Sequence, residues 1–128
     1  MTSLCEDDRG SSPVEFVLVG TLLTVLTLAV VQLGVAVYVR NVLHDAAVEG
    51  AYHGALADTS LTDGAVRTDH LIQTAVNGLD VAVTARDTTA LGVPAVEVTV
   101  IATLPLVGLL GIPAGMEVTA HAPRESFD

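Results

Sequence analysis

The residues of this chain that could take part in chemistry are few and far apart. Fifteen carboxylates, five arginines, four histidines and one cysteine in 128 residues give a formal net charge of -10. No phosphate-binding glycine loop, Gly-x-Ser-x-Gly or His-Glu-x-x-His motif occurs, and Cys5 alone forms neither an internal disulfide nor a zinc site. The sequence therefore predicts no catalytic residue, no metal and no cofactor. Its acidic balance argues against a nucleic-acid partner.

One carboxylate stands out by its position, because Glu15 lies at the entrance of a long apolar run. The 24 residues from Phe16 to Val39 contain no Asp, Glu, Lys, Arg or His. A helix of that length spans roughly 36 Å and can cross a hydrocarbon core of about 30 Å, so we expect contact with a lipid bilayer. A secretory signal peptide fits less well, since its apolar region is about 7 to 15 residues after a basic leader, and this leader is acidic.

Two interpretations of the junction before the apolar run remain open. In the first, Ser12 is the N-cap, Pro13 the first helical residue and Glu15 the third, which makes a capping box. In the second, glycine, four residues, glutamate and a long apolar helix resemble the processing junction of type IV pilins. That resemblance implies cleavage between Gly10 and Ser11 by a prepilin peptidase. It also implies that Glu15 pairs with the freed α-amine of a neighbouring subunit, because a carboxylate facing lipid is costly without a partner charge.

The resemblance continues beyond the apolar run. The segment from Asn41 to Ala55 is similar to the small-residue stretch of the TadE-like family, usually written L-x-x-A-A-R-E-G-A-R. These proteins are minor pseudopilins of the tight-adherence (Tad/Flp) pilus. The matching positions are Leu43, Ala46, Ala47, Glu49, Gly50 and Ala51, whereas Val48 and Tyr52 stand where arginine is common. The resemblance implies a single-pass protein of the bacterial inner membrane that works with other pilins, pseudopilins and pilus platform proteins.

The stretch after the apolar run also carries two patterns whose role the sequence leaves open. Small residues would let another helix approach closely, either from a partner subunit or from the chain's own outer domain; they are Ala47, Gly50, Ala51 and Gly54. Asp45, Glu49 and His53 recur every four residues and share one helix face. We interpret that face as a solvated stripe rather than a cation site.

The remaining residues predict a small α+β domain. A loop over 58–64, with Thr62 and Asp63 as candidate caps, precedes a helix over 65–79. Period-two alternation then predicts a three-stranded antiparallel sheet. Its apolar face holds Val81, Val83, Ala85, Val96, Val98, Val100, Ala102, Val118, Ala120 and Ala122, and the turns are expected at 91–94 and 112–115.

The run from Leu104 to Ile112 is apolar but too short to cross a membrane. It either docks a partner or the membrane surface, with Leu106, Leu109 and Leu110 as candidate contacts, or folds over the sheet as core.

Together these features predict a cytoplasmic prepilin-like leader over 1–10, a transmembrane and membrane-proximal helix over 11–57, and an extracytoplasmic domain over 58–128. The expected work is structural, in assembly of a Tad/Flp-type pilus. The alternative is an unprocessed, membrane-anchored module that binds an extracytoplasmic ligand.

Overall fold

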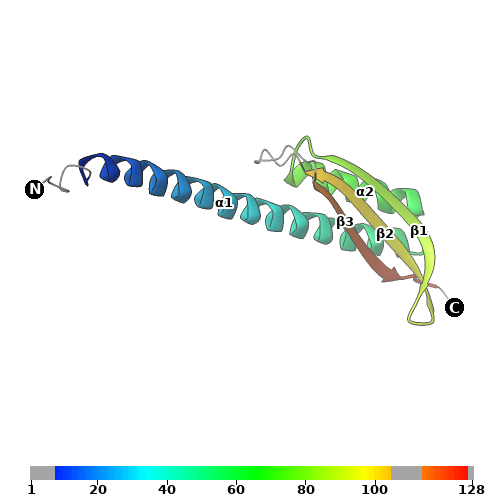
Figure 1. The fold of residues 1–128 in the computed structure, drawn as a ribbon. Coiled ribbons are helices and arrows are strands. Elements are labelled where there is room, and N and C mark those ends of the chain that lie inside the picture. The colour runs from blue at the N-terminus through cyan, green and yellow to red at the C-terminus, as the bar shows by residue number, and fades with distance from the viewer. Residues whose placement is uncertain (1–7, 105–113, 127–128) are drawn as a thin grey trace, which may run out of the picture. The chain divides into compact units, whose positions relative to one another are not determined.

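The computed structural model describes residues 8–104 and 114–126. Helix α1 (Asp8–Ala55) is followed by helix α2 (Leu61–Ala75) and by strands β1 (Asp80–Ala90), β2 (Val93–Leu104) and β3 (Ala114–Pro123) (Figure 1). The strands pair antiparallel in the order β1-β2-β3. This confirms the predicted α+β fold class. The chain forms two compact units, Met1–Val35 and Ala36–Asp128, so the second half of α1 belongs to the same unit as α2 and the sheet.

Helix α1 begins earlier than the expected cap. Its first residue is Asp8, and Pro13 lies inside it, so the prediction that the helix starts at a Ser12 capping box is wrong. Pro13 has no N–H to donate to the carbonyl oxygen four residues back, and such a loss is tolerated near the start of a helix. That carbonyl belongs to Arg9, in the first turn, so only one terminal hydrogen bond is lost.

Helix α2 begins at Leu61, four residues before the predicted start at 65, and its N-cap is Ser60 rather than Thr62 or Asp63. Ser60 is the N-cap: its Oγ accepts a hydrogen bond from the Asp63 N–H at 3.2 Å, and its own N–H donates to Asp63 Oδ2 at 2.8 Å. The backbone and side-chain hydrogen bonds from Ser60 lower the pKa of Asp63. Four N–H groups of a helix start lack partners, and this capping box pairs two donors at that start.

The C-terminal end of α2 also lies earlier in the chain than predicted. The helix stops at Ala75 rather than 79. The Gln73 side chain closes the turn by donating to the Leu79 carbonyl at 2.9 Å and accepting from the Gly78 N–H at 3.1 Å. Gly78 has a φ of 81°, which glycine adopts without steric cost.

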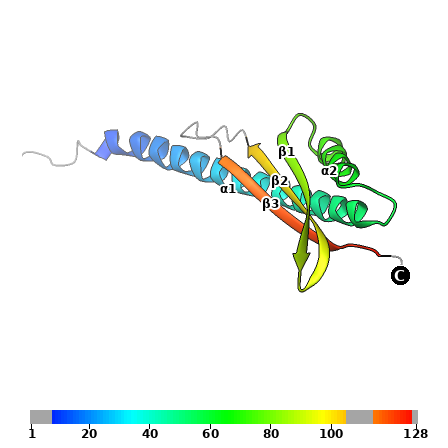
Figure 2. The same cartoon turned by 90° about the vertical axis from the view of Figure 1, so that its right-hand side faces the viewer.

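The core lies between the sheet and the two helices, which pack on the same face of the sheet within the second unit (Figures 1 and 2). The predicted alternation is confirmed, because the inward residues of β2 and β3 are buried and their neighbours on β3 are mostly exposed. The buried apolar strand residues on the helix-facing side are Val96, Val98, Val100, Ala102, Leu104, Val118, Ala120 and Ala122, and Ala95 of β2 is buried as well. The predicted contacts Leu106, Leu109 and Leu110 lie outside the described residues.

The hairpin between β1 and β2 has a two-residue loop. Ala90 pairs with Val93, and the residues between them, Leu91 and Gly92, have φ values of 52° and 82°. Two successive positive φ values are the signature of a type I′ turn, which suits Asn-Gly. For leucine this left-handed conformation is unfavourable by roughly 1–2 kcal/mol. The Leu91 side chain is fully exposed, so no contact with the described chain offsets that cost.

We therefore expect Leu91→Asn to raise the free energy of unfolding of the outer domain by about 0.5–1 kcal/mol. The substitution keeps the turn and removes most of the steric strain. Urea denaturation followed by circular dichroism measures the effect, with Thr89→Asn on the adjoining strand as a control that brings no such gain. A lower midpoint for Leu91→Asn than for the wild type would contradict the assignment of strain to this turn.

Candidate membrane anchor and helix-packing site

The first half of α1 presents an apolar surface that nothing in the described chain covers. The helix from Gly10 to Ala55 is long and apolar enough to cross a membrane; its most apolar 18-residue window has a mean hydropathy of 2.4 and none of that window is buried. Phe16 is 79% exposed and Leu33 65%. An apolar surface of this extent marks contact with a membrane or a partner. These properties make α1 a candidate membrane anchor.

Three threonine hydroxyls within the apolar run are satisfied by the helix itself. The hydroxyls of Thr21, Thr24 and Thr27 each donate to the carbonyl four residues earlier, at 2.7, 2.8 and 2.8 Å. An unpaired donor would cost several kcal/mol in hydrocarbon, whereas a hydroxyl bonded to its own helix can face lipid. The three threonines are therefore compatible with a lipid-facing helix.

The predicted processing residues lie in the first two turns of α1. Gly10, Ser11 and Glu15 are all exposed. A Cβ added at Gly10 would meet no atom of residues 8–104 or 114–126 within 4 Å, so this part of the fold places no steric demand on the glycine. Both residues of the predicted cleavage bond lie in the first turn of α1, and helix ends fray at low cost. The Gly10–Ser11 bond thus lies where the backbone can be presented to a peptidase.

The small residues of the TadE-like stretch form the contact between α1 and the outer domain. Leu43, Ala47 and Ala51 are fully buried. A Cβ on Gly50 would overlap the Thr68 hydroxyl and lie 2.8 Å from the Gly64 carbonyl oxygen, and one on Gly64 would lie 2.7 Å from the Gly50 carbonyl oxygen. The two helix backbones therefore touch here. Of the two alternatives left open by the sequence, the structure has packing within the chain, and it buries Ala47, Gly50, Ala51 and Gly54 in that contact.

The carboxylate face of the same helix is solvated. Asp45 and Glu49 are exposed, and Glu49 forms an ion pair with Arg67 of α2 at 3.3 Å. The His53 carbonyl accepts a hydrogen bond from the Thr59 hydroxyl. Over the described ranges, no three His, Cys, Asp or Glu side chains are grouped so that they could hold a metal ion.

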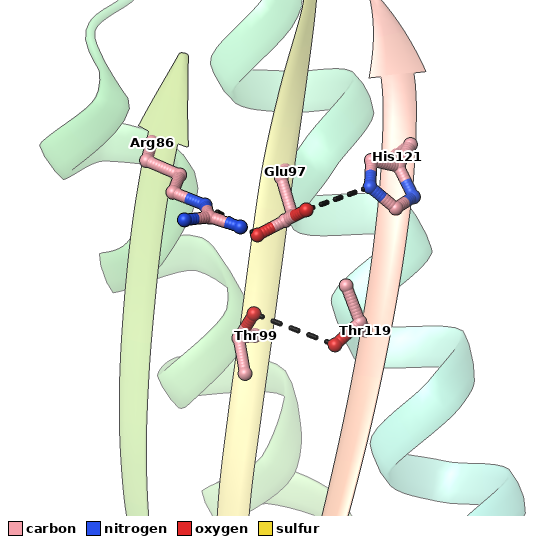
Figure 3. Close-up of polar contacts among 5 residues, drawn as sticks. All are labelled: Arg86, Glu97, Thr99, Thr119 and His121. Atoms are coloured by element: carbon pink, nitrogen blue, oxygen red, sulfur yellow. Dashed lines mark hydrogen bonds and ion pairs between the residues drawn. The ribbon is translucent and has the colours of Figure 1, made fainter. Parts of the chain in front are cut away.

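The outer face of the sheet carries a charged cluster that was not predicted from the sequence. Glu97 at the centre of β2 accepts a hydrogen bond from Arg86 Nε of β1 at 2.5 Å and lies 2.8 Å from His121 Nε2 of β3 (Figure 3). Thr99 and Thr119 follow in the next row, their hydroxyls 3.4 Å apart. The Glu97 side chain is only 11% exposed. Arg86, Glu97 and His121 alternate with the predicted apolar residues of their strands, but the strand register that joins them is not visible in the sequence.

The cluster predicts a contribution of Glu97 to the acid response of the outer domain. The hydrogen bond from Arg86 lowers the pKa of Glu97, and the contact with His121 acts in the same direction, against the opposing effect of desolvation. A lowered carboxyl pKa stabilises the fold above the ordinary glutamate pKa of roughly 4.3, and this contribution is lost as the pH falls through the lowered value.

We expect the melting temperature of the wild-type domain to fall by several degrees between about pH 5 and pH 3, and to fall less in Glu97→Gln. Differential scanning calorimetry across this range measures both slopes. Glu117→Gln is the matched control. Glu117 of β3 lies on the same face of the sheet as Glu97 but has no ion pair within the described ranges. Equal acid slopes in the wild type and Glu97→Gln would show that this cluster does not set the acid response.

Comparison with known proteins agrees with the geometry of α1. The family model described as TadE-like protein matches residues 10–51. No curated protein and no solved structure matches the chain. The matched segment begins at the predicted processing glycine and ends in the helix contact at Gly50 and Ala51. It thus includes the apolar run and most of the small-residue stretch. The resemblance predicted from the sequence is confirmed over residues 10–51, and this match together with the candidate membrane helix fits a membrane protein associated with a Tad pilus.

Proposed function

We propose that this chain is a pseudopilin-like, single-pass membrane protein that acts structurally in assembly of a Tad/Flp-type pilus. A prepilin peptidase cleaves it between Gly10 and Ser11, and the mature chain associates with other pilins, pseudopilins and platform proteins. The observation that carries the proposal is the coincidence of the TadE-like match over 10–51 with an unburied apolar helix. No reaction is assigned to the chain itself.

The orientation follows from the proposed processing. Residues 1–10 form a cytoplasmic leader, residues 11–57 the transmembrane and membrane-proximal helix, and residues 58–128 an extracytoplasmic domain on the outer side of the inner membrane. Beyond Arg40 the sequence has three arginines against eleven carboxylates. This negative charge keeps the outer domain away from anionic lipid, which supports a domain that stands off the membrane surface.

Glu15 supplies the proposed subunit contact. It is exposed one turn after Ser11, beside the apolar run. Cleavage after Gly10 would create an α-amine at Ser11, and the Glu15 carboxylate of an adjacent subunit would neutralise such an amine at the edge of the hydrocarbon. An ion pair at this depth favours association at a single axial register, because a shift along the helix would leave both charges unpaired.

N-terminal sequencing of the protein isolated from its native host tests the processing step. We expect Ser11 as the first residue of the wild type and an uncleaved leader in Gly10→Ala. Gly20→Ala is the matched control, because a Cβ at Gly20 also meets no atom within 4 Å, and it should be cleaved normally. An intact leader on the wild-type protein would contradict the proposal and favour the unprocessed binding module.

A further inference from the structure

A shallow groove of about 380 Å³ lies between α1 and α2 and has no role in the contact already described. Val42, Asp45, Ala46 and Glu49 of α1 line one wall, and Leu71 and Ala75 of α2 line the other. Ala46 is buried, Leu71 packs against the core, and Ala75 is exposed. The groove therefore has an apolar floor and an acidic rim on one side only.

The shape of the groove fits a third helix. An amphipathic helix can lay its apolar face into a hydrophobic groove, and small residues on both walls allow a close approach. Ala46 and Ala75 supply such residues from the two walls. Val42 of α1 and Leu71 of α2 add one apolar side chain to each wall, so the occupant needs an apolar stripe.

The negative charge of the rim favours an occupant with a basic side chain. Glu49 has one cationic partner, Arg67 at 3.3 Å, whereas within the described ranges no basic side chain lies in ion-pair distance of Asp45. A second copy of this chain would bring a further net charge of -10 and no lysine, so self-association is opposed by repulsion. An arginine or lysine opposite Asp45 would instead complement the rim.

We propose that this groove docks a basic amphipathic helix of a different protein, with apolar residues on the floor and a cation at Asp45. The inference deepens the proposed function, on which it rests for the choice of host cell, by giving the chemistry of one partner. It does not require cleavage after Gly10.

Site-specific photocrosslinking of the full chain in its native host tests the inference. A benzophenone-bearing amino acid is placed at position 75, inside the groove, and at position 66, where Val66 is 63% exposed on α2 and does not line the groove. We expect a discrete cross-link from position 75 and none from position 66. Peptide mapping by mass spectrometry should place it in a helix that carries arginine or lysine beside an apolar stripe.

Charge reversal distinguishes docking from incidental proximity. Asp45→Lys should reduce the cross-link about tenfold, and reversing the mapped basic residue of the partner to glutamate should restore it. Asp69→Lys is the matched control, since Asp69 is an exposed carboxylate of α2 that does not line the groove, and it should leave the yield unchanged. Melting curves of both variants verify that the domain remains folded.

The inference is overturned by an absent cross-link at position 75, by a cross-link to a second copy or to an acidic segment, or by equal losses in Asp45→Lys and Asp69→Lys. N-terminal sequencing of the same samples separates it from the proposed function. An intact leader with a basic helix captured at position 75 refutes the processing and supports docking. A Ser11 terminus with nothing captured does the reverse.

Discussion

Gly50→Val is expected to unfold the outer domain or to destabilise it more than any other single substitution considered. The added side chain would enter the space of the Thr68 hydroxyl and of the Gly64 carbonyl oxygen. Overpacking in a core typically costs 1–3 kcal/mol, and we expect about 3 kcal/mol or more here because the obstacle is the backbone of a second helix. The gain in helix propensity over glycine, below about 1 kcal/mol, does not offset that cost.

Thermal unfolding of the full chain in detergent measures this effect, when it is followed by the circular dichroism signal of the β-sheet. Gly34→Val is the matched control: it is the same substitution on the same helix, at a position where a Cβ meets no atom within 4 Å. Thr68→Ala should not rescue Gly50→Val, because the Gly64 carbonyl remains 2.8 Å from the added Cβ. A Gly50→Val domain that melts with the wild type would refute the close helix contact.

Glu15→Gln is expected to abolish assembly while leaving membrane insertion intact. Glutamine keeps the size of the side chain and removes its charge, so the proposed pair with a neighbouring α-amine is lost. Removing one partner of a poorly solvated ion pair costs about 3 kcal/mol, which is roughly 100-fold in an association constant. Insertion depends on the apolar run after position 15, which the substitution does not touch.

Electron microscopy of pili on cells carrying each variant measures assembly, and membrane fractionation measures insertion. Glu125→Gln serves as control, since Glu125 is a carboxylate of the outer domain whose backbone N–H, rather than its side chain, bonds to the Ala55 carbonyl at 2.9 Å. Normal piliation in Glu15→Gln would show that Glu15 has no pairing role.

The parts of the fold that follow from local pattern were predictable. The period of two placed Val98 and Val118 on the buried face, and the unbroken apolar run marked the anchor. Boundaries were less predictable where side chains compete for caps. Thr62 and Asp63 both suit a helix start, yet the reciprocal bonds between Ser60 and Asp63 place it at Ser60.

The remaining features depend on tertiary register. That Gly50 faces Gly64 requires knowing how two helices cross, and small residues alone suit a partner helix equally well. The Arg86–Glu97–His121 cluster needs the pairing of three strands. The groove between α1 and α2 could not be predicted without the positions of both helices. For this reason the sequence indicated only a solvated face for Asp45 and Glu49.

Carbonate extraction of membranes from the native host is the most direct test that α1 is a lipid-embedded anchor. The account predicts that the chain stays in the membrane pellet at high pH and is released only by detergent, as expected for an unburied apolar helix with a mean hydropathy of 2.4. Recovery of the chain as a monomer from the aqueous fraction, without detergent, would contradict it.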